Sequence, residues 1–327
     1  MPSAGRRSEA GHVGAAGQAA PERLAALIGT YSIEMTAKDG NALREAKDLI
    51  PQGASVSITF LAGEAAAARV AAAKQARSYG FHPKPHISAR RLASAQELEA
   101  FLAELAAEAR IDRAFVVAGD VGTPAGPYFD ALAVIRSGLL GKYGVRHVGI
   151  SGYPEGHPDF SHEKLWQALR DKRQALTDLG HSYDIVTQFA FDAKPVLDWL
   201  AKLRDSGIAA PVRVGVPGPA SVRTLLRFAA RCGVGASASV MAKYGVSITQ
   251  LVTTAGPDAL IAELAGGIDP GRHGQVFLHF YPFGGVAKTA QWIRDFSAGL
   301  RDIESGAKPG GIGRTIRGWF SNGSGLR

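Results

Sequence analysis

Hydrophobic and polar positions alternate along the chain with two different periods. Short apolar runs rich in β-branched and aromatic residues predict buried strands, whereas longer Ala- and Leu-rich stretches repeat their apolar positions at the spacing of a helix. The expected strands occupy residues 30–36, 56–61, 84–89, 114–118, 147–151, 184–191, 212–216 and 275–280. The clearest helices are expected at residues 64–80, 94–110, 161–180 and 221–233, with one or two more within 236–264.

Residues at the ends of these stretches support the helix boundaries. Ser94 has a capping-box glutamate, Glu97, three residues further on. Gly80 and Gly233 stand where two of the helices are expected to end, which is a common position for glycine. The pattern is therefore one of strands separated by helices.

This alternation predicts a parallel sheet. Eight strands, each followed by a helix, favour a (β/α)8 TIM barrel. An open doubly wound sheet is the alternative, but the sequence TAKDGNAL follows the first strand in place of a Gly-rich dinucleotide-binding turn. We therefore predict one barrel domain over residues 21–305, a disordered tail over 1–20 and a Gly-rich basic tail over 306–327, where Trp319 and Phe320 are candidate anchors.

Composition narrows the classes of partner and compartment. The net charge is +8, yet Lys and Arg are scattered without a long basic run, which argues against nucleic acid and suits a small polyanion such as a phosphorylated cofactor or a polycarboxylate substrate. The single cysteine, Cys232, excludes an internal disulfide framework and a cysteine metal cluster. No stretch is long and apolar enough to span a membrane. We expect a cytoplasmic protein.

Polar side chains follow the apolar residues at the ends of seven of the eight expected strands. In a (β/α)8 barrel the carboxyl ends of the strands meet at one face, where active sites lie. The sequence therefore predicts a site at this face. Its candidate residues are Glu34, Thr59, His86, Asp120, Tyr153 with His157, Gln188 and Tyr281.

The residue types limit the chemistry of this site. No local ligand spacing supports a metal centre, and we predict no metal there. The G-x-S-x-G motif of a serine hydrolase is missing from the sequence. Two separated carboxylates, hydroxyl groups and a glutamine amide suit a large heteroaromatic ligand or cofactor that forms hydrogen bonds.

Several segments resemble the methylenetetrahydrofolate reductase family, and the resemblance runs in order over about residues 29–300. The most specific are GYPEGHPD at 152–159 and VTQFAFD at 186–192, and the others are AGDVGTP at 118–124, LLRFAARCG at 225–233 and LHFYPF at 278–283. The resemblance implies a (β/α)8 barrel that binds FAD and interconverts 5,10-methylene- and 5-methyltetrahydrofolate. The usual electron source in the family is NADH or NADPH, between which the sequence does not choose. Homo-oligomers are common in the family.

The resemblance also implies roles for individual residues. Glu34 corresponds to the acid that protonates N10 of the folate, and Asp120 to the aspartate between flavin and pterin. Gln188 corresponds to the glutamine that binds the pterin, and Phe228 to the aromatic residue that stacks on the benzoyl ring. Tyr281 lies in the matching motif of the last strand, on the substrate side. The positions that correspond to flavin contacts are Thr59, His86, Gly119, Asp120, Tyr153, His157 and Lys172.

Other positions depart from the family pattern. Ala118 replaces the arginine of the family's R-G-D motif, and Ala168 and Asp171 stand where the family tends to have an asparagine and a basic residue for FAD. An aspartate near a diphosphate is unfavourable by simple electrostatics. A second hypothesis therefore stays open, in which the chain is a tetrahydrofolate-binding barrel without redox activity that serves as a folate carrier or methyl-transfer partner.

Overall fold

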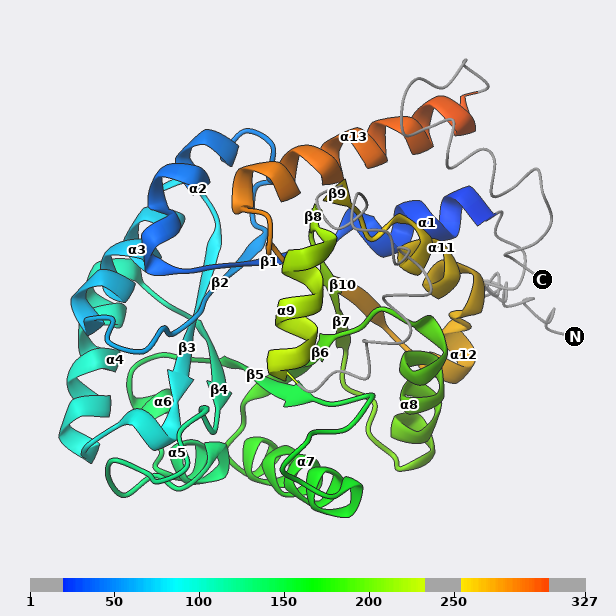
Figure 1. Ribbon diagram of the computed structural model, residues 1–327. Helices are drawn as coiled ribbons and strands as arrows, with labels where there is room; N and C mark the ends of the chain where they lie inside the picture. Colours follow the sequence, from blue (N-terminus) through cyan, green and yellow to red (C-terminus); the bar gives the residue numbers. More distant parts are fainter. Residues whose placement is uncertain (1–19, 233–253, 306–327) are drawn as a thin grey trace, which may run out of the picture.

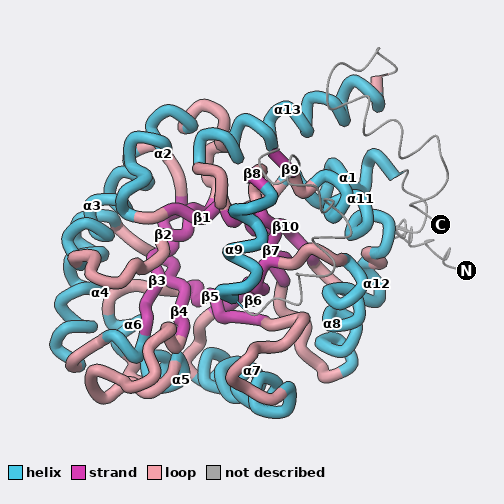
Figure 2. Tube along the Cα trace, viewed as in Figure 1, coloured by secondary structure: helices cyan, strands magenta, loops and turns pink. Residues whose placement is uncertain are grey.

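The computed structural model describes residues 20–232 and 254–305, and in them eight parallel strands close into a barrel. Around the barrel the strands follow the order β1-β10-β7-β6-β5-β4-β3-β2, and β2 pairs with β1 to complete the ring. Figure 2 shows this ring with the helices outside it. The barrel strands are β1 (Ser32–Met35), β2 (Ser55–Ile58), β3 (His82–Ser88), β4 (Arg113–Val117), β5 (His147–Gly152), β6 (Ser182–Phe189), β7 (Val212–Pro217) and β10 (Val276–Tyr281). The predicted (β/α)8 fold is confirmed.

Helices follow the strands and cover the outside of the barrel (Figure 1). The N-terminal helix α1 packs against α11 and α13, beside β10. The helices of the first half are α1 (Ala20–Gly29), η2 (Ala37–Asp39), α2 (Gly40–Ala46), α3 (Ala66–Ser78), η3 (Ala89–Arg91), α4 (Ala95–Ala109), α5 (Ala131–Arg136) and α6 (Leu139–Lys142). Those of the second half are α7 (His162–Asp178), α8 (Ala193–Asp205), α9 (Val222–Cys232), α11 (Asp258–Gly267), α12 (Pro270–His273) and α13 (Val286–Glu304). No helix in the described ranges is long and apolar enough to cross a membrane.

Local capping explains where the long helices begin. The hydroxyl of Ser94 accepts a hydrogen bond from the backbone N–H of Glu97 at the start of α4, as the sequence predicted. Ser161 caps α7 in the same way through the N–H of Lys164. The helix α3 ends before Gly80, which adopts a left-handed backbone with φ of 81°.

One small element interrupts the strand–helix alternation after β7. The short strands β8 (Ala220–Ser221) and β9 (Thr254–Ala255) pair antiparallel, and α9 starts directly after β8. Of the extra helices predicted within 236–264, α11 begins inside that range, while residues 233–253 lie outside the described residues. The predicted tails, with Trp319 and Phe320, lie there too, and the predicted domain boundaries stay predictions.

The half of the barrel interior nearest the amino-terminal ends of the strands contains a buried ionic layer, which we define as Lys84, His147, Asp184 and Arg213. The Lys84 Nζ lies 2.5 Å from one oxygen of Asp184, and the Arg213 Nε lies 2.8 Å from the other. His147 Nε2 approaches the same carboxylate at 3.4 Å. A Cβ at Gly149 would come within 2.5 Å of the Lys84 Nζ, so β5, two strands away from β3 in the barrel, leaves room for the lysine by having a glycine.

Candidate active site

Glu34 lies at the carboxyl end of β1, and its side chain points into the barrel between two histidines. Its Oε2 is 3.6 Å from Nε2 of His86 on β3 and 3.7 Å from Nε2 of His279 on β10. Only 18% of the Glu34 side chain is exposed. Burial raises the pKa of the carboxyl, and the nearby His86 opposes this only in part. We call Glu34, His86 and His279 the Glu34 layer.

Both histidines of this layer are neutral near pH 7. Burial lowers the pKa of His86 to about 4 and that of His279 to about 3. The Nδ1 of His279 is 2.8 Å from the hydroxyl of Ser32, two residues before Glu34 on the same strand. Neutral imidazoles provide no full charge to stabilise a carboxylate. The surroundings of Glu34 therefore favour the protonated carboxyl, which can donate a proton.

A backbone irregularity lies at the end of β6, next to Gln188. The pairing of β6 with β7 shifts register between Val186 and Phe189, as in a β-bulge. The Gln188 side-chain oxygen accepts a hydrogen bond from the N–H of Phe189. Its amide nitrogen makes no hydrogen bond to any described residue. Gln188 is half-buried, so this nitrogen is a donor available to a ligand.

Tyr281, at the end of β10, connects this bulge to the Glu34 layer. Its hydroxyl donates to the backbone carbonyl of Thr187 at 3.0 Å, and its ring lies edge-on to His279 with 4.8 Å between the centroids. A Cβ at Gly215 on β7 would lie 2.7 Å from both the Thr187 carbonyl oxygen and the Tyr281 ring, so the close approach requires glycine there. Burial raises the pKa of Tyr281 well above its usual value, and Glu34 contributes in the same direction.

The loop after β5 forms the compact turn expected from its prolines and glycine. The rings of Tyr153 and His157 meet edge to face at 5.4 Å, and His157 also contacts Phe160 at 5.0 Å. The N–H of Gly156 donates to the carbonyl of Tyr153, and the N–H of Asp159 donates to Nδ1 of His157. Burial raises the pKa of Tyr153. The loop thus presents two aromatic rings in a fixed arrangement.

Asp120 lies at the rim of the barrel and has a cationic partner that the sequence did not predict. Its side chain is 67% exposed and receives two hydrogen bonds from Arg91, of 2.5 and 3.1 Å. The Arg91 guanidinium lowers the pKa of the Asp120 carboxyl. Arg91 also lies over the ring of Phe60, and the two residues line a cavity of about 380 Å³ together with Arg69.

Three further predicted residues lie on this side of the barrel. Thr59, just after β2, is half-buried, and its N–H donates to the carbonyl of Met35. Gly119 follows β4 with a φ of 93°. Lys172 on α7 is buried, and its ammonium makes no hydrogen bond to any described residue. Burial lowers the pKa of Lys172 to about 8, although Asp130 opposes the shift.

Helix α9 passes over the carboxyl ends of the strands (Figure 1). Burial raises the pKa of the thiol of Cys232, the last residue of α9, and the Glu34 carboxyl contributes in the same direction. Phe228, one turn earlier, stacks on Phe283 with 4.1 Å between ring centroids and 14° between the ring planes. Phe228 of α9 and Phe283, in the loop after β10, therefore form a stacked aromatic pair.

Among the predicted residues, the structure brings Glu34 and His86 into close contact, and the ring of Tyr281 contacts His279 of the same layer. Asp120 lies further out at the rim. The sequence pattern did not single out His279, Ser32 or Arg91. The first two could have been found, because residues two apart on a strand face the same side and these precede Tyr281 and Glu34 by two positions. Within the described residues, no group of three or more His, Cys, Asp or Glu side chains could hold a metal ion.

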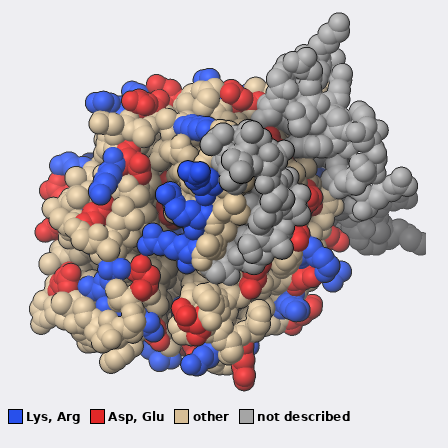
Figure 3. All heavy atoms as spheres, in the orientation of Figure 1, with Lys and Arg blue, Asp and Glu red and all other residues tan. Residues whose placement is uncertain are grey.

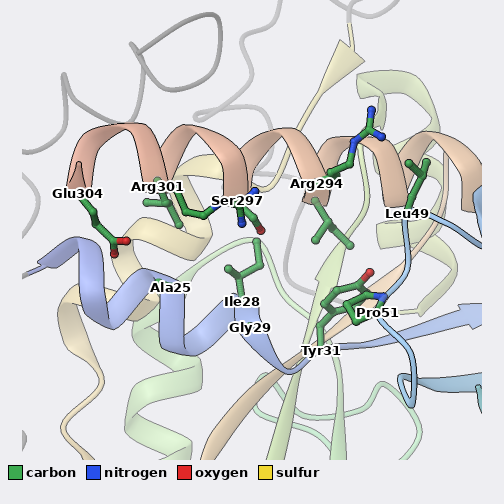
Figure 4. A pocket seen from close by; sticks show the side chains of 12 residues that line it. Ala25, Ile28, Gly29, Tyr31, Leu49, Pro51, Arg294, Ser297, Arg301 and Glu304 are labelled. Carbon is green, nitrogen blue, oxygen red and sulfur yellow. The ribbon is translucent and has the colours of Figure 1, made fainter. Parts of the chain in front are cut away.

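A separate cavity of about 300 Å³ lies between α1 and α13 (Figure 4). Tyr31, directly before β1, and Arg294 and Arg301 on α13 line it. Because Tyr31 precedes β1 and Glu34 is near the end of that strand, this cavity is on the amino-terminal side of the barrel. It is not part of the candidate active site.

Comparisons with known proteins give the family. The chain spans a small part of one curated relative, "Methylenetetrahydrofolate reductase 2" of Saccharomyces cerevisiae: the two are 30% identical over 107 residues, which is 32% of this chain and 16% of the yeast protein. Among solved structures, the dihydropteroate synthase of Thermus thermophilus superposes with a TM-score of 0.45 at 12% identity, covering 82% of this chain and 93% of the other. That of Burkholderia cenocepacia gives a TM-score of 0.43 at 15% identity, with 84% and 93% covered. The family model for methylenetetrahydrofolate reductase matches residues 38–281, well over half of the chain, and the chain therefore belongs to the methylenetetrahydrofolate reductase family.

Proposed function

We propose that this protein is a flavin-dependent reductase that interconverts 5,10-methylenetetrahydrofolate and 5-methyltetrahydrofolate. The family assignment supports the reaction class. The observation that supports it most among the residues is the buried Glu34 carboxyl, whose raised pKa and neutral neighbours suit a proton donor.

Opening the methylene bridge of the substrate requires a proton on N10 of the folate. In our proposal the protonated Glu34 donates this proton, and the ring opens to leave an electrophilic iminium at N5. The carboxylate that remains is disfavoured by its surroundings, so it recovers a proton readily before the next turnover. In the opposite direction the same carboxylate accepts the proton from N10.

Other residues at the mouth bind and orient the folate. The amide nitrogen of Gln188, which has no partner among the described residues, would donate to the pterin. The stacked pair of Phe228 and Phe283 offers a flat apolar surface for the benzoyl ring. Tyr281 would line the substrate side, because its hydroxyl is fixed by Thr187 and its ring contacts His279.

The residues at the mouth of the barrel fit FAD, and the surroundings of Lys172 are the observation that supports this fit most. The Lys172 side chain is buried and its ammonium has no hydrogen-bonding partner among the described residues, which suits an anion such as a diphosphate. Thr59, His86, Gly119, Tyr153 and His157 would line the rest of the flavin site. When bound, FAD would supply two-electron transfer to and from the folate carbon. NADH or NADPH would serve as the electron source.

Arg91 offers an explanation for the replacement of the family arginine by Ala118. Its guanidinium reaches Asp120 from the η3 turn after β3, so a positive charge accompanies this aspartate from another strand. In our proposal Asp120 stands at the boundary between flavin and pterin and affects both electrostatically. The pairing with Arg91 reduces the negative charge that the flavin would experience.

The second candidate is a tetrahydrofolate-binding barrel without redox activity. The replacements on α7 favour it: the Ala168 side chain offers no hydrogen bond, and the Asp171 carboxylate, which accepts a hydrogen bond from Gln167, adds negative charge to the same helix. Such a protein would bind folate at the same mouth as a carrier or methyl-transfer partner.

The visible absorption spectrum of the purified protein distinguishes the two candidates. We expect a flavin spectrum that bleaches on anaerobic addition of 5-methyltetrahydrofolate. A protein that stays colourless after reconstitution with FAD, yet binds tetrahydrofolate, would support the non-redox candidate. A bound flavin that this folate does not reduce would contradict the proposed reaction.

A further inference from the structure

The cavity of about 380 Å³ next to Arg91 lies outside the barrel wall, among residues of α3, α4 and the end of β3. His86 points into the barrel toward Glu34, and side chains alternate along a strand, so Ile87 points outward, where it lines the cavity. We call this space the α3–α4 cavity. Its volume is that of a small-molecule site, for which about 300 Å³ is the lower end.

Arg69 on α3 places a buried cation at this cavity. The residue is 7% exposed, and its guanidinium carbon lies 4.4 Å from the ring centroid of Phe60 and 4.3 Å from that of Phe101. Its Nη1 donates to the backbone carbonyl of His86, whereas its Nε is buried and has no hydrogen-bonding partner among the described residues. A buried N–H group without a partner costs free energy. An acceptor on a ligand would therefore stabilise Arg69 in this position.

Glu64, just before α3, adds an acid to the same cavity that is also incompletely paired. Its Oε1 is buried and has no hydrogen-bonding partner in the described part of the chain, and its Oε2 accepts only a long hydrogen bond of 3.4 Å from the N–H of Leu61. Burial lowers the pKa of Arg69 to about 10 and Glu64 opposes this shift, yet the two side chains form no ion pair with each other. Both charges can therefore pair with a ligand.

The two other charged residues that line the cavity already have partners. Arg91 donates two hydrogen bonds to the Asp120 carboxylate, and Glu97 accepts one from the N–H of Ala93 at the start of α4. Figure 3 shows Lys and Arg side chains interspersed with Asp and Glu side chains over α3 and α4, on the left, so neither sign of charge predominates there. One cation and one acid of the cavity lining are thus left for a ligand, which suits a small zwitterion better than a polyanion.

The amino-terminal end of α3 adds donors for the anionic part of such a ligand. Gly63, Ala65 and Ala66 line the cavity where the helix begins. The N-cap position is Ala65, so no side chain caps the first N–H groups of the helix. Uncapped N–H groups at a helix start attract anions. Together with the guanidinium of Arg69 they suit a carboxylate.

We propose that the α3–α4 cavity binds a free α-amino acid with an apolar side chain. The carboxylate would pair with Arg69 and the start of α3, and the ammonium would pair with Glu64. The apolar side chain would lie against Phe60, Leu92 and Phe101, which also line the cavity. The inference does not depend on the proposed function, because the cavity lies outside the barrel wall and such a ligand is neither the folate nor the flavin.

Isothermal titration of the intact protein with L-leucine tests this proposal. We expect saturable binding of one equivalent. Two analogues separate the charges of the ligand: isocaproate lacks the ammonium of leucine, and isoamylamine lacks its carboxylate. Each analogue should bind roughly tenfold more weakly or worse, because one buried charged group of the protein then stays without its partner.

Two variants with matched controls locate the site. Glu64→Gln should bind L-leucine and isocaproate with similar affinity, because the neutral amide does not pair with an ammonium. Ala66→Leu should fill the cavity and abolish binding of L-leucine. The controls are Glu104→Gln and Ala68→Leu, at exposed positions on α4 and α3, and both should bind L-leucine as the unsubstituted protein does.

Three results would overturn the proposal. Absence of L-leucine binding to the unsubstituted protein refutes the amino-acid site. Equal affinity of that protein for L-leucine and isocaproate would show a site for anions alone, in which Glu64 takes no part. Undiminished binding of L-leucine to Ala66→Leu would place the ligand elsewhere on the molecule. All three results leave the proposed folate reaction standing, since the flavin spectrum tests that reaction separately.

Discussion

The barrel interior contains two layers of buried titratable residues that treat a carboxyl group in opposite ways. In the ionic layer, burial alone would raise the pKa of Asp184, but Lys84, His147 and Arg213 together hold it well below its usual value. In the Glu34 layer, burial raises the pKa of Glu34, and its partners are two histidines that burial keeps neutral. Burial is common to both layers, so the charge of the partners decides which carboxyl keeps its proton.

Because of this difference, we expect the ionic layer to stabilise the fold and the Glu34 layer to take part in the reaction. The Asp184 carboxylate, whose charge is compensated by Lys84 and Arg213, joins β6 to β3 and β7. The Glu34 carboxyl, at the carboxyl end of β1, has no cationic partner and can exchange its proton with a ligand. The following predictions test whether the two layers differ in this way, and they run from the largest expected effect to the smallest.

Replacing the acid of the Glu34 layer should have the largest effect on activity. We expect Glu34→Gln to slow folate reduction by about 10²- to 10⁴-fold, the usual contribution of a positioned general acid, while reduction of the flavin by the nicotinamide cofactor stays nearly unchanged. Stopped-flow measurement of the two half-reactions separates these steps. The exposed Glu108→Gln is the control and should alter neither. Folate turnover at the normal rate in Glu34→Gln would refute the proton-donor role.

Breaking the ionic layer should have the largest effect on stability. Lys84→Met leaves a buried carboxylate with one cation fewer, and losing one partner of a buried ion pair typically costs about 3–5 kcal/mol. Urea unfolding measures the loss. Lys74→Met, which breaks the exposed pair with Glu108, is the matched control and should cost about 1 kcal/mol or less. Similar losses in the two variants would show that the ionic layer does not stabilise the fold.

The two carboxyls should affect the pH dependence of stability with opposite signs. Asp184 has a lowered pKa, so its contribution to the free energy of unfolding is present above about pH 3.8, the usual aspartate value, and is lost as the pH falls below it. Glu34 has a raised pKa, so its contribution is present below about 4.5 and is lost as the pH rises through the folded-state value. A tenfold difference in proton affinity between the folded and unfolded states corresponds to about 1.4 kcal/mol of stability.

Thermal unfolding across pH measures this difference in two variants. Asp184→Asn should flatten the acid limb of the stability curve, whereas Glu34→Gln should flatten the loss on the alkaline side of 4.5. If the acid limb were the same in the unsubstituted protein and in Asp184→Asn, the lowered pKa that we assign to Asp184 in the ionic layer would be contradicted.

The smallest effect is expected at the rim, where solvent screens the charges. Asp120→Asn removes a negative charge near the proposed flavin and should raise its midpoint potential, whereas Arg91→Leu should lower it. The pairing of the two residues makes both shifts modest. Potentiometric titration with reference dyes measures them. Shifts of the same sign in the two variants would contradict this placement of the flavin.

The strands and their order could be predicted from the sequence because each strand is a local signal. The strand predicted at 147–151 is β5 at His147–Gly152, and the one at 212–216 is β7 at Val212–Pro217. The strand predicted at 84–89 is β3 at His82–Ser88, which starts two residues earlier and contains Pro83 and Pro85. The structure accommodates them because pairing with β4 begins only at His86, so their missing N–H groups do not interrupt that ladder.

The site was predictable only in part, for a physical reason. Glu34, His86 and Tyr281 stand at strand ends, and barrel geometry brings strand ends together. The pair of Lys84 and Asp184 joins residues 100 positions apart, and no local pattern relates them. The contact of Arg91 with Asp120 depends on the reach of a long side chain between two loops. Such contacts follow from packing, which hydrophobic periodicity does not encode.

The protonation state of Glu34 is the most direct test of this account. Infrared difference spectroscopy between the unsubstituted protein and Glu34→Gln, at about pH 6, reports whether this carboxyl holds a proton above the usual glutamate pKa. We predict a carboxylic-acid carbonyl band that is present in the unsubstituted protein and absent from the variant. A difference spectrum with only carboxylate bands would mean that Glu34 is ionised like Asp184, and that the two layers do not differ as proposed.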